Sequence, residues 1–153
     1  MANTTARRLR ERVRCSRGAT LVEAAIITPL LLLLTFSIVD FGSVFYIYLS
    51  LESGVSQATR FAVTGNQFSG MTRDESIRQA MRQATPTLTI ADSAFTFSHL
   101  SGGAWTNGSG GPDEIMKVTV NYTWTLMTPL IRPFFPNGQV NVVVESAMKN
   151  ERF

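Results

Sequence analysis

The sequence predicts an α+β protein, with a long N-terminal helix followed by a head of one further helix and an antiparallel sheet of three or four strands. Two observations carry this prediction. Apolar residues in the first part of the chain follow the three-and-four spacing of a helix, and those in the last third alternate with polar residues, as in a half-buried strand. With 153 residues, the chain has room for one modest domain beyond the helix.

Positive charge is concentrated at the N-terminus. Residues 1–18 hold six arginines and one acidic residue, Glu11, whereas residues 19–153 hold the other 8 basic and 10 acidic side chains of the 14 and 11 in total. A nucleic-acid-binding domain carries its basic residues on the folded part, so we expect no nucleic-acid partner. The single cysteine, Cys15, excludes an intrachain disulfide.

The segment from Ala19 to Val39 is apolar enough to cross a membrane. It holds one charge, Glu23, and as a helix extended to Asp40 it measures about 31 Å, close to the ~30 Å hydrocarbon core of a bilayer. The arginines before it place the N-terminus in the cytoplasm. We therefore predict a basic leader over residues 1–18 and a transmembrane half-helix over residues 19–40, with the lipid bilayer as a partner. A secretory signal peptide is the alternative, but no convincing small-x-small cleavage site follows the apolar run.

The helix is expected to run on from about residue 20 to residue 63. Beyond the membrane half, its apolar positions advance by three and four, which predicts an amphipathic half over residues 41–65. These positions are Phe41, Val44, Tyr48, Leu51, Val55, Ala58 and Ala62. Gly65 can provide a left-handed cap at the end. Pro29 removes one backbone hydrogen bond within the membrane half and predicts a kink there.

Residues 66–153 are expected to form an extracytoplasmic α+β head that begins with a second helix. Thr72 and Glu75 have the spacing of a capping box. In this motif, the side-chain oxygen of each residue accepts a hydrogen bond from the backbone N–H of the other. Apolar residues at helical spacing follow, and Pro86 ends the pattern. The sequence thus predicts a short amphipathic helix directly after Thr72.

Strands are expected after this second helix. Apolar residues occupy every second position from Met116 to Leu126, and shorter alternating sets lie at Val140–Val144 and Phe95–Phe97. The glycine-rich segment between Leu100 and Asp113 is interpreted as a flexible hairpin loop, because it has no phosphate-binding lysine with a following helix. Trp105 in this segment is a candidate contact between the head and another subunit or a surface.

The sequence contains no constellation that would support catalysis. His99 is the only histidine, and no acidic residue adjoins it. The acidic pairs at residues 74–75 and 113–114 fit a helix start and a turn better than a catalytic pair. We therefore predict no catalytic residue, no cofactor and no metal site, and expect that the protein is not an enzyme.

Glu23 lies one turn into the membrane segment, where a carboxylate costs roughly 2.5–3.5 kcal/mol even on translocon-insertion scales. One interpretation places it close enough to the cytoplasmic interface to reach water or Arg17. The other comes from its neighbours, because the stretch from Arg17 to Glu23 resembles the cleavage motif of type IV prepilins. In that motif Gly18 would be the last residue of the leader, and Ala19 the first of the mature chain.

The resemblance extends beyond this junction to the TadE-like family, the pseudopilins or minor pilins of the tight-adherence (Tad, Flp) system. It is carried by the junction itself, by Pro29 six residues after Glu23, by the run of leucines that follows, and by Asp40-Phe41-Gly42 after the span. It is strong over about residues 17–63 and loose beyond. One departure is Ala24, since this prepilin motif commonly has an aromatic residue directly after the glutamate.

The resemblance implies a pilin-like fold and cleavage after Gly18 by a prepilin peptidase. Glu23 would then be an assembly carboxylate that pairs with the new α-amino group of Ala19 on an adjacent subunit. The implied partners are the peptidase, other pilin or pseudopilin subunits and the inner-membrane Tad machinery, and the implied location is the cytoplasmic membrane, the pilus or the cell surface. The role that the resemblance implies for the protein is assembly, priming or adhesion of the pilus. The alternative is an uncleaved, signal-anchored membrane protein whose head is a binding module.

Overall fold

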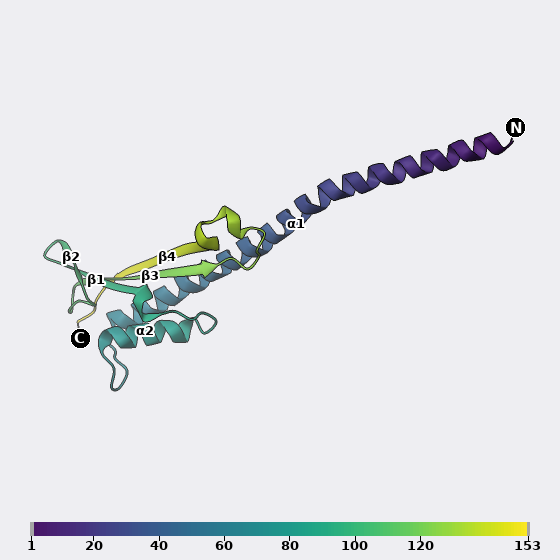
Figure 1. The fold of residues 1–153 in the computed structure, drawn as a ribbon. Coiled ribbons are helices and arrows are strands. Elements are labelled where there is room, and N and C mark those ends of the chain that lie inside the picture. The colour runs from purple at the N-terminus through teal and green to yellow at the C-terminus, as the bar shows by residue number, and fades with distance from the viewer. Residues whose placement is uncertain (1, 153) are drawn as a thin grey trace.

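The computed structural model describes the backbone of residues 2–152 and the side chains of residues 18–152. It contains one long helix, a second short helix and a four-stranded antiparallel sheet, so the predicted α+β, pilin-like fold is confirmed (Figure 1). The elements are α1 (Ala2–Val63), α2 (Arg73–Ala84), β1 (Phe95–Ser101), β2 (Ala104–Asn107), β3 (Ile115–Thr125) and β4 (Gln139–Lys149), with 3-10 turns η1 (Asp92–Ala94), η2 (Arg132–Phe134) and η3 (Pro136–Gly138).

Helix α1 is longer than expected at its N-terminal end. The sequence predicted a start near residue 20, whereas the helix begins at Ala2 and includes residues 2–18, the predicted basic leader. Residues 1–17 contain no glycine and no proline, so no residue there breaks a helix. The helix continues through Pro29 and ends at Val63, where Gly65 has a φ of 69° and donates its N–H to the Ala62 carbonyl at 3.1 Å. The predicted C-terminal end is confirmed.

Helix α2 has the predicted cap. The Glu75 N–H donates to the Thr72 hydroxyl at 3.3 Å, and the Thr72 N–H donates to the Glu75 carboxylate at 2.8 Å. Ile77 and Met81 on its apolar face are fully buried. Both the start and the buried face of this helix were therefore predictable from local sequence.

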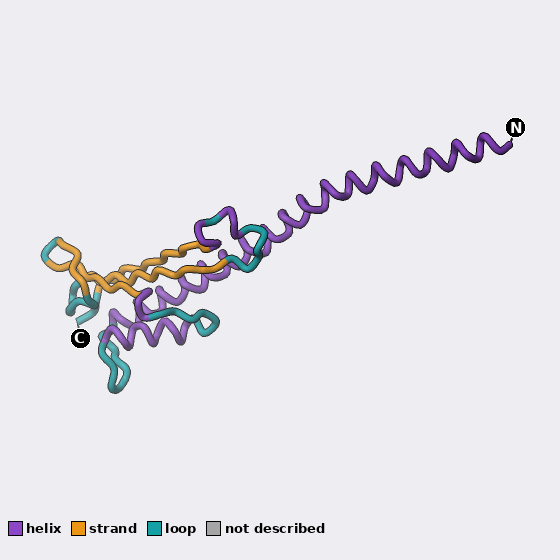
Figure 2. The backbone as a smooth tube through the Cα atoms, in the orientation of Figure 1, coloured by secondary structure: helices purple, strands orange, loops and turns teal. Residues whose placement is uncertain are grey.

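The sheet has the strand order β2-β1-β3-β4, and all of its neighbouring strands are antiparallel (Figure 2). Strands β3 and β4 pair along their whole lengths, from Ile115 opposite Lys149 to Thr125 opposite Gln139. The prediction of a flexible loop between Leu100 and Asp113 is wrong for residues 104–107, which form strand β2. Gly102 and Gly103, with φ of 60° and 89°, close a two-residue hairpin that places Ala104 opposite Ser101.

The core lies between the inner face of the sheet and the two helices. Side chains from α1, α2 and the sheet meet there with almost no exposed surface, among them Leu51, Val55, Ile77, Met81, Met116, Val118 and Val120. Gly54 lets the helices approach closely, because a Cβ added there would lie 2.5 Å from the Thr85 Cγ2 atom. Helix α2 and the sheet therefore pack on the C-terminal half of α1, and the N-terminal half extends beyond them (Figure 1).

The predicted apolar stripe of α1 is correct at its distal end and wrong at two proximal positions. Leu51, Val55, Ala58 and Ala62 are buried, whereas Phe41 is 74% exposed and Tyr48 is 41% exposed. Ile47 and Asp40 occupy the buried positions instead, each 2% exposed. Steps of three and of four are both compatible with a helical face, so only the packing of the head selects between neighbouring residues.

Candidate functional site

The N-terminal half of α1 presents an uncovered apolar surface. The stretch Gly18–Val63 is long and apolar enough to cross a membrane, with a mean hydropathy of 2.2 over an 18-residue window of which none is buried. The side chains of Leu30 to Leu34 are 36–68% exposed. Figure 1 shows this half extending away from the head. A contiguous apolar surface of this kind marks contact with lipid or with another protein.

Gly18, Ala19 and Glu23 lie together near the start of this half. All three are exposed, and nothing lies within 4 Å of a Cβ added at Gly18. Ala19 and Glu23 are four residues apart on one helix, so they share a face. The helical backbone therefore places the expected new amino group and the carboxylate side by side on a surface that a second subunit can reach.

The Glu23 carboxylate has no hydrogen bond or ion pair to any side chain of residues 18–152. Arg17, its other predicted neighbour, lies outside the residues whose side chains are described. Pro29 is also exposed and lies within the helix two turns further on. Within the described side chains, a charge at Glu23 therefore needs water or another molecule for its compensation.

Asp40 joins the end of the apolar half to the head. Its Oδ1 atom accepts hydrogen bonds from the backbone N–H groups of Met127 at 2.9 Å and Thr128 at 3.3 Å, and its Oδ2 atom accepts one from the Thr128 hydroxyl. The side chain is 2% exposed, and these donors compensate its burial. The carboxylate thus fixes where the segment after β3 lies along α1.

Asp40 is part of the Asp40-Phe41-Gly42 motif, but the sequence predicted no role for its side chain. An acidic residue directly after an apolar span was the available signal. Its hydrogen-bond partners lie 87 and 88 residues further along the chain, so no local pattern could identify them.

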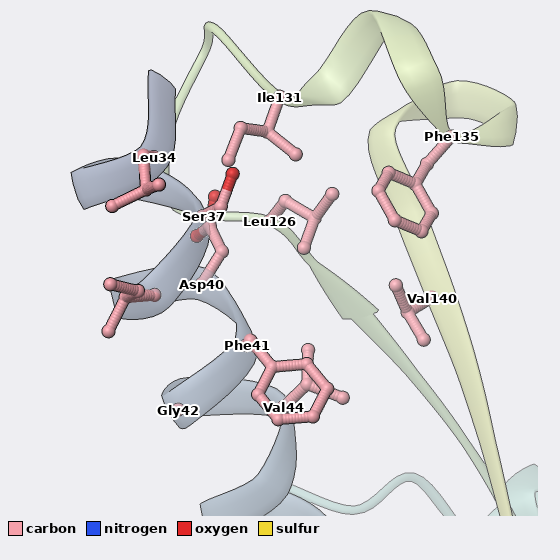
Figure 3. A pocket seen from close by; sticks show the side chains of 11 residues that line it. Leu34, Ser37, Asp40, Phe41, Gly42, Val44, Leu126, Ile131, Phe135 and Val140 are labelled. Carbon is pink, nitrogen blue, oxygen red and sulfur yellow. The ribbon is translucent and has the colours of Figure 1, made fainter. Parts of the chain in front are cut away.

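A groove of about 790 Å³ lies next to Asp40, between α1 and the segment that joins β3 to β4 (Figure 3). Its walls are almost entirely apolar, with Leu34, Ile38, Phe41 and Val44 from the helix facing Leu126, Ile131, Phe135 and Val140. In Figure 3, Ile131 extends toward the helix, and the Phe135 ring lies next to Val140 on the opposite wall. The groove therefore marks the boundary between the uncovered and the packed halves of α1.

Trp105, the predicted head contact, lies on β2 at the edge of the sheet and is 49% exposed. The Lys117 Nζ atom is 4.9 Å from the centroid of its ring and 3.6 Å from the Glu145 carboxylate. These side chains follow a diagonal across the outer face of the sheet. They lie far from Glu23, at the other end of the molecule, so the structure does not bring the predicted residues into one site.

Residues 18–60 match the family model of TadE-like proteins. The chain carries a TadE-like domain. The match begins at Gly18 and ends in the last turn of α1, so it includes Glu23 and Asp40 but not α2 or the sheet. No curated protein and no solved structure matches the chain.

In the head, outside the TadE-like domain, the distal polar groups hold loops together. The His99 Nε2 atom lies 2.8 Å from the Thr106 hydroxyl, and its Nδ1 atom lies 3.2 Å from the Gly108 carbonyl. The Gly111 N–H donates to Glu114 at 2.6 Å, and this hydrogen bond is the main cause of the lowered pKa of that carboxyl. Among the described residues, no three His, Cys, Asp or Glu side chains form a group that could hold a metal ion.

Proposed function

We propose that this TadE-like protein is a pseudopilin or minor pilin that acts in the assembly, priming or adhesion of Tad-type pili. The observation that carries the proposal is where the family match begins. It starts at Gly18, the residue after which a prepilin peptidase would cut, and the apolar, uncovered part of α1 follows directly. The leader, residues 1–18, would remain in the cytoplasm, and residues 66–153 would form the head on the far side of the membrane.

Cleavage would change the charge at the start of α1. Hydrolysis of the Gly18–Ala19 peptide bond removes the six arginines of the leader and leaves a free α-amino group on Ala19. A Glu23 carboxylate of one subunit can then pair with the Ala19 amine of its neighbour. This pairing offsets the cost of burying each charge between apolar helices, and it sets how far one subunit is shifted along the next.

The exposed leucines of α1 have a role both in the membrane and in the assembled pilus. In the membrane they contact lipid, and in an assembly they contact the same half of neighbouring helices. The head keeps its own core on the C-terminal half of the helix, so withdrawal from lipid does not require it to unfold. The partners in this proposal are the prepilin peptidase, other pilin or pseudopilin subunits and the inner-membrane Tad machinery.

The N-terminus of the mature protein tests the proposal. Protein extracted from membranes of the native host should begin at Ala19 by mass spectrometry. Gly18→Leu is the matched variant: a Cβ added at Gly18 has no atom within 4 Å, so the fold should persist while the leader is retained. A peptidase-competent host that yields only chains beginning at Met1 or Ala2 would refute processing and favour the uncleaved, signal-anchored binding protein.

Glu23→Ala tests the assembly role separately. Removing one partner of a buried ion pair costs about 3–5 kcal/mol, so we expect assembled protein or pilus-dependent attachment to fall by about tenfold or more. Membrane insertion should be unchanged. Glu52→Ala is the control, because Glu52 is an exposed acidic residue on the same helix beyond the membrane half. Equal assembly in both variants would exclude an intersubunit role for Glu23.

A further inference from the structure

Exposed apolar side chains gather on the connection between β3 and β4, residues 126–138, which we call the β3–β4 segment. Phe134 is 72% exposed, Met127 60%, Leu130 45% and Phe135 41%. Arg132 is the one charged residue in the segment. So many apolar side chains on one short connection mark a contact surface.

The position of this segment along α1 is fixed by polar and apolar contacts. Asp40 accepts hydrogen bonds from Met127 and Thr128, and Ile131 and Phe135 line the groove opposite Leu34 and Ile38. Leu34 precedes Asp40 by six residues, so the segment reaches back about 9 Å along the helix. It therefore lies beside the last turns of the apolar half of α1, at the end of the head from which that half extends (Figure 1).

We propose that the β3–β4 segment is a second membrane contact, in which Met127, Leu130, Phe134 and Phe135 enter the extracytoplasmic surface of the phospholipid bilayer. This inference rests on the proposed function, since it requires α1 to span that bilayer. Insertion of α1 to the level of Asp40 brings the segment to the lipid surface without any further partner. A second copy of the chain could cover the same side chains only at a high local protein concentration in the membrane.

The backbone of the segment suits a site of low water content. Seven of its N–H groups donate within the protein, those of residues 126, 127, 128, 131, 134, 135 and 138. Three more of its residues, Pro129, Pro133 and Pro136, have no N–H group. Unsatisfied backbone groups are costly near hydrocarbon, so this bonding lowers the cost of approaching lipid. The prolines also reduce the conformational entropy lost when the segment is held in one shape.

The charge of the segment agrees with a phospholipid partner. Residues 126–140 contain no acidic residue, and Arg132 is exposed while its Nε atom donates to the Leu126 carbonyl at 2.9 Å. A guanidinium held in this way can also contact phosphate groups. The opposite end of the head carries ion pairs such as Lys149–Asp113 and Arg152–Asp113 instead. This distribution of charge favours lipid contact at the end of the head that adjoins the apolar half of α1.

Lipid-quenching fluorescence on the full-length chain tests this inference. In a Cys15→Ser background, a fluorophore sensitive to polarity is attached to Phe134→Cys, and the protein is reconstituted in vesicles of phosphatidylcholine and phosphatidylglycerol with nitroxide-labelled lipids. Leu32→Cys in the membrane half is the positive reference, and Ser69→Cys in the distal α1–α2 loop is the negative one. Phe134 is largely exposed, so its replacement leaves the core intact.

We expect blue-shifted emission at Phe134 and quenching several times that at Ser69, with shallow nitroxides more effective than deep ones. Quenching at Leu32 with none at Phe134 would overturn the second membrane contact while α1 remains inserted. No quenching at Leu32 would overturn membrane insertion itself, and this inference with it. A blue shift at Phe134 that needs a high protein-to-lipid ratio and is insensitive to nitroxide lipids would assign the surface to a second copy and also overturn the proposal.

Discussion

The two halves of α1 place the same type of residue in opposite environments. Leu30 to Leu34 are 36–68% exposed, whereas Leu51, five turns further along the same helix, has no exposed surface. No residue of the first group is buried, whereas Leu51 packs in the core with α2 and the sheet. One continuous helix therefore has an uncovered apolar surface in its first half and an intramolecular core in its second, and Asp40 lies where one becomes the other.

Truncation of one leucine in each half should sharpen this comparison most. Leu51→Ala should lower the free energy of unfolding by about 2–5 kcal/mol, because it leaves a cavity in the core. Leu32→Ala should leave it unchanged, since Leu32 has no core contacts to lose. Urea unfolding of the full-length chain in detergent micelles, followed by tryptophan fluorescence, measures both. Equal losses would contradict the division of α1 into an uncovered half and a half that belongs to the core.

Loss of the carboxylate at the boundary should have the next largest effect. Asp40→Ala leaves two N–H groups and one hydroxyl without their acceptor, so we expect a loss of about 3 kcal/mol. Asp40→Asn retains one acceptor oxygen and should lose less. Hydrogen exchange at the Met127 and Thr128 amides should accelerate in Asp40→Ala. Unchanged exchange there would show that Asp40 does not hold the β3–β4 segment.

The two internal glycines of the C-terminal half give a smaller, opposite pair of effects. Gly54→Ala should destabilise the protein by about 1–2 kcal/mol, since the new methyl group would overlap Thr85 and outweigh the gain in helix propensity. Gly42→Ala meets no atom within 4 Å and should stabilise the helix by about 0.5–1 kcal/mol. Melting temperatures of the two variants should shift in opposite directions. Shifts of one sign would contradict the close approach of α1 and α2 at Gly54.

Lowering the pH should destabilise the distal end of the head, and this is the smallest of the expected effects. The pKa of Glu75 is lowered because the Thr72 N–H and hydroxyl donate to it, and the pKa of Glu114 is lowered chiefly by the Gly111 N–H. A lowered pKa in the folded state stabilises the fold above the ordinary glutamate value of 4.5, and this contribution is lost as the pH falls through the lowered value. Stability measured from pH 6 to pH 3 should therefore decline less in Glu75→Gln than in the unmodified chain. Parallel curves would exclude the cap as a source of the pH dependence.

Much of the fold follows from local patterns. The capping box at Thr72 predicted the start of α2, alternation predicted β3 and β4, and the glycine at residue 65 predicted the end of α1. The candidate cleavage residues Gly18 and Ala19 and the carboxylate of Glu23 were also identified from a short motif. Their roles remain predictions, because they depend on a peptidase and on a neighbouring subunit.

By itself, the sequence determined that an apolar helix precedes an α+β head, because helical and strand periodicity and capping act between residues close in the chain. Only the tertiary structure decided that Ile47 is buried and Tyr48 exposed, that Trp105 lies on an edge strand, and that Asp40 holds the segment after β3. The physical reason is distance along the chain. A hydrogen bond between residues 87 positions apart forms only when the intervening helix and sheet have packed, and it leaves no periodic trace in the sequence.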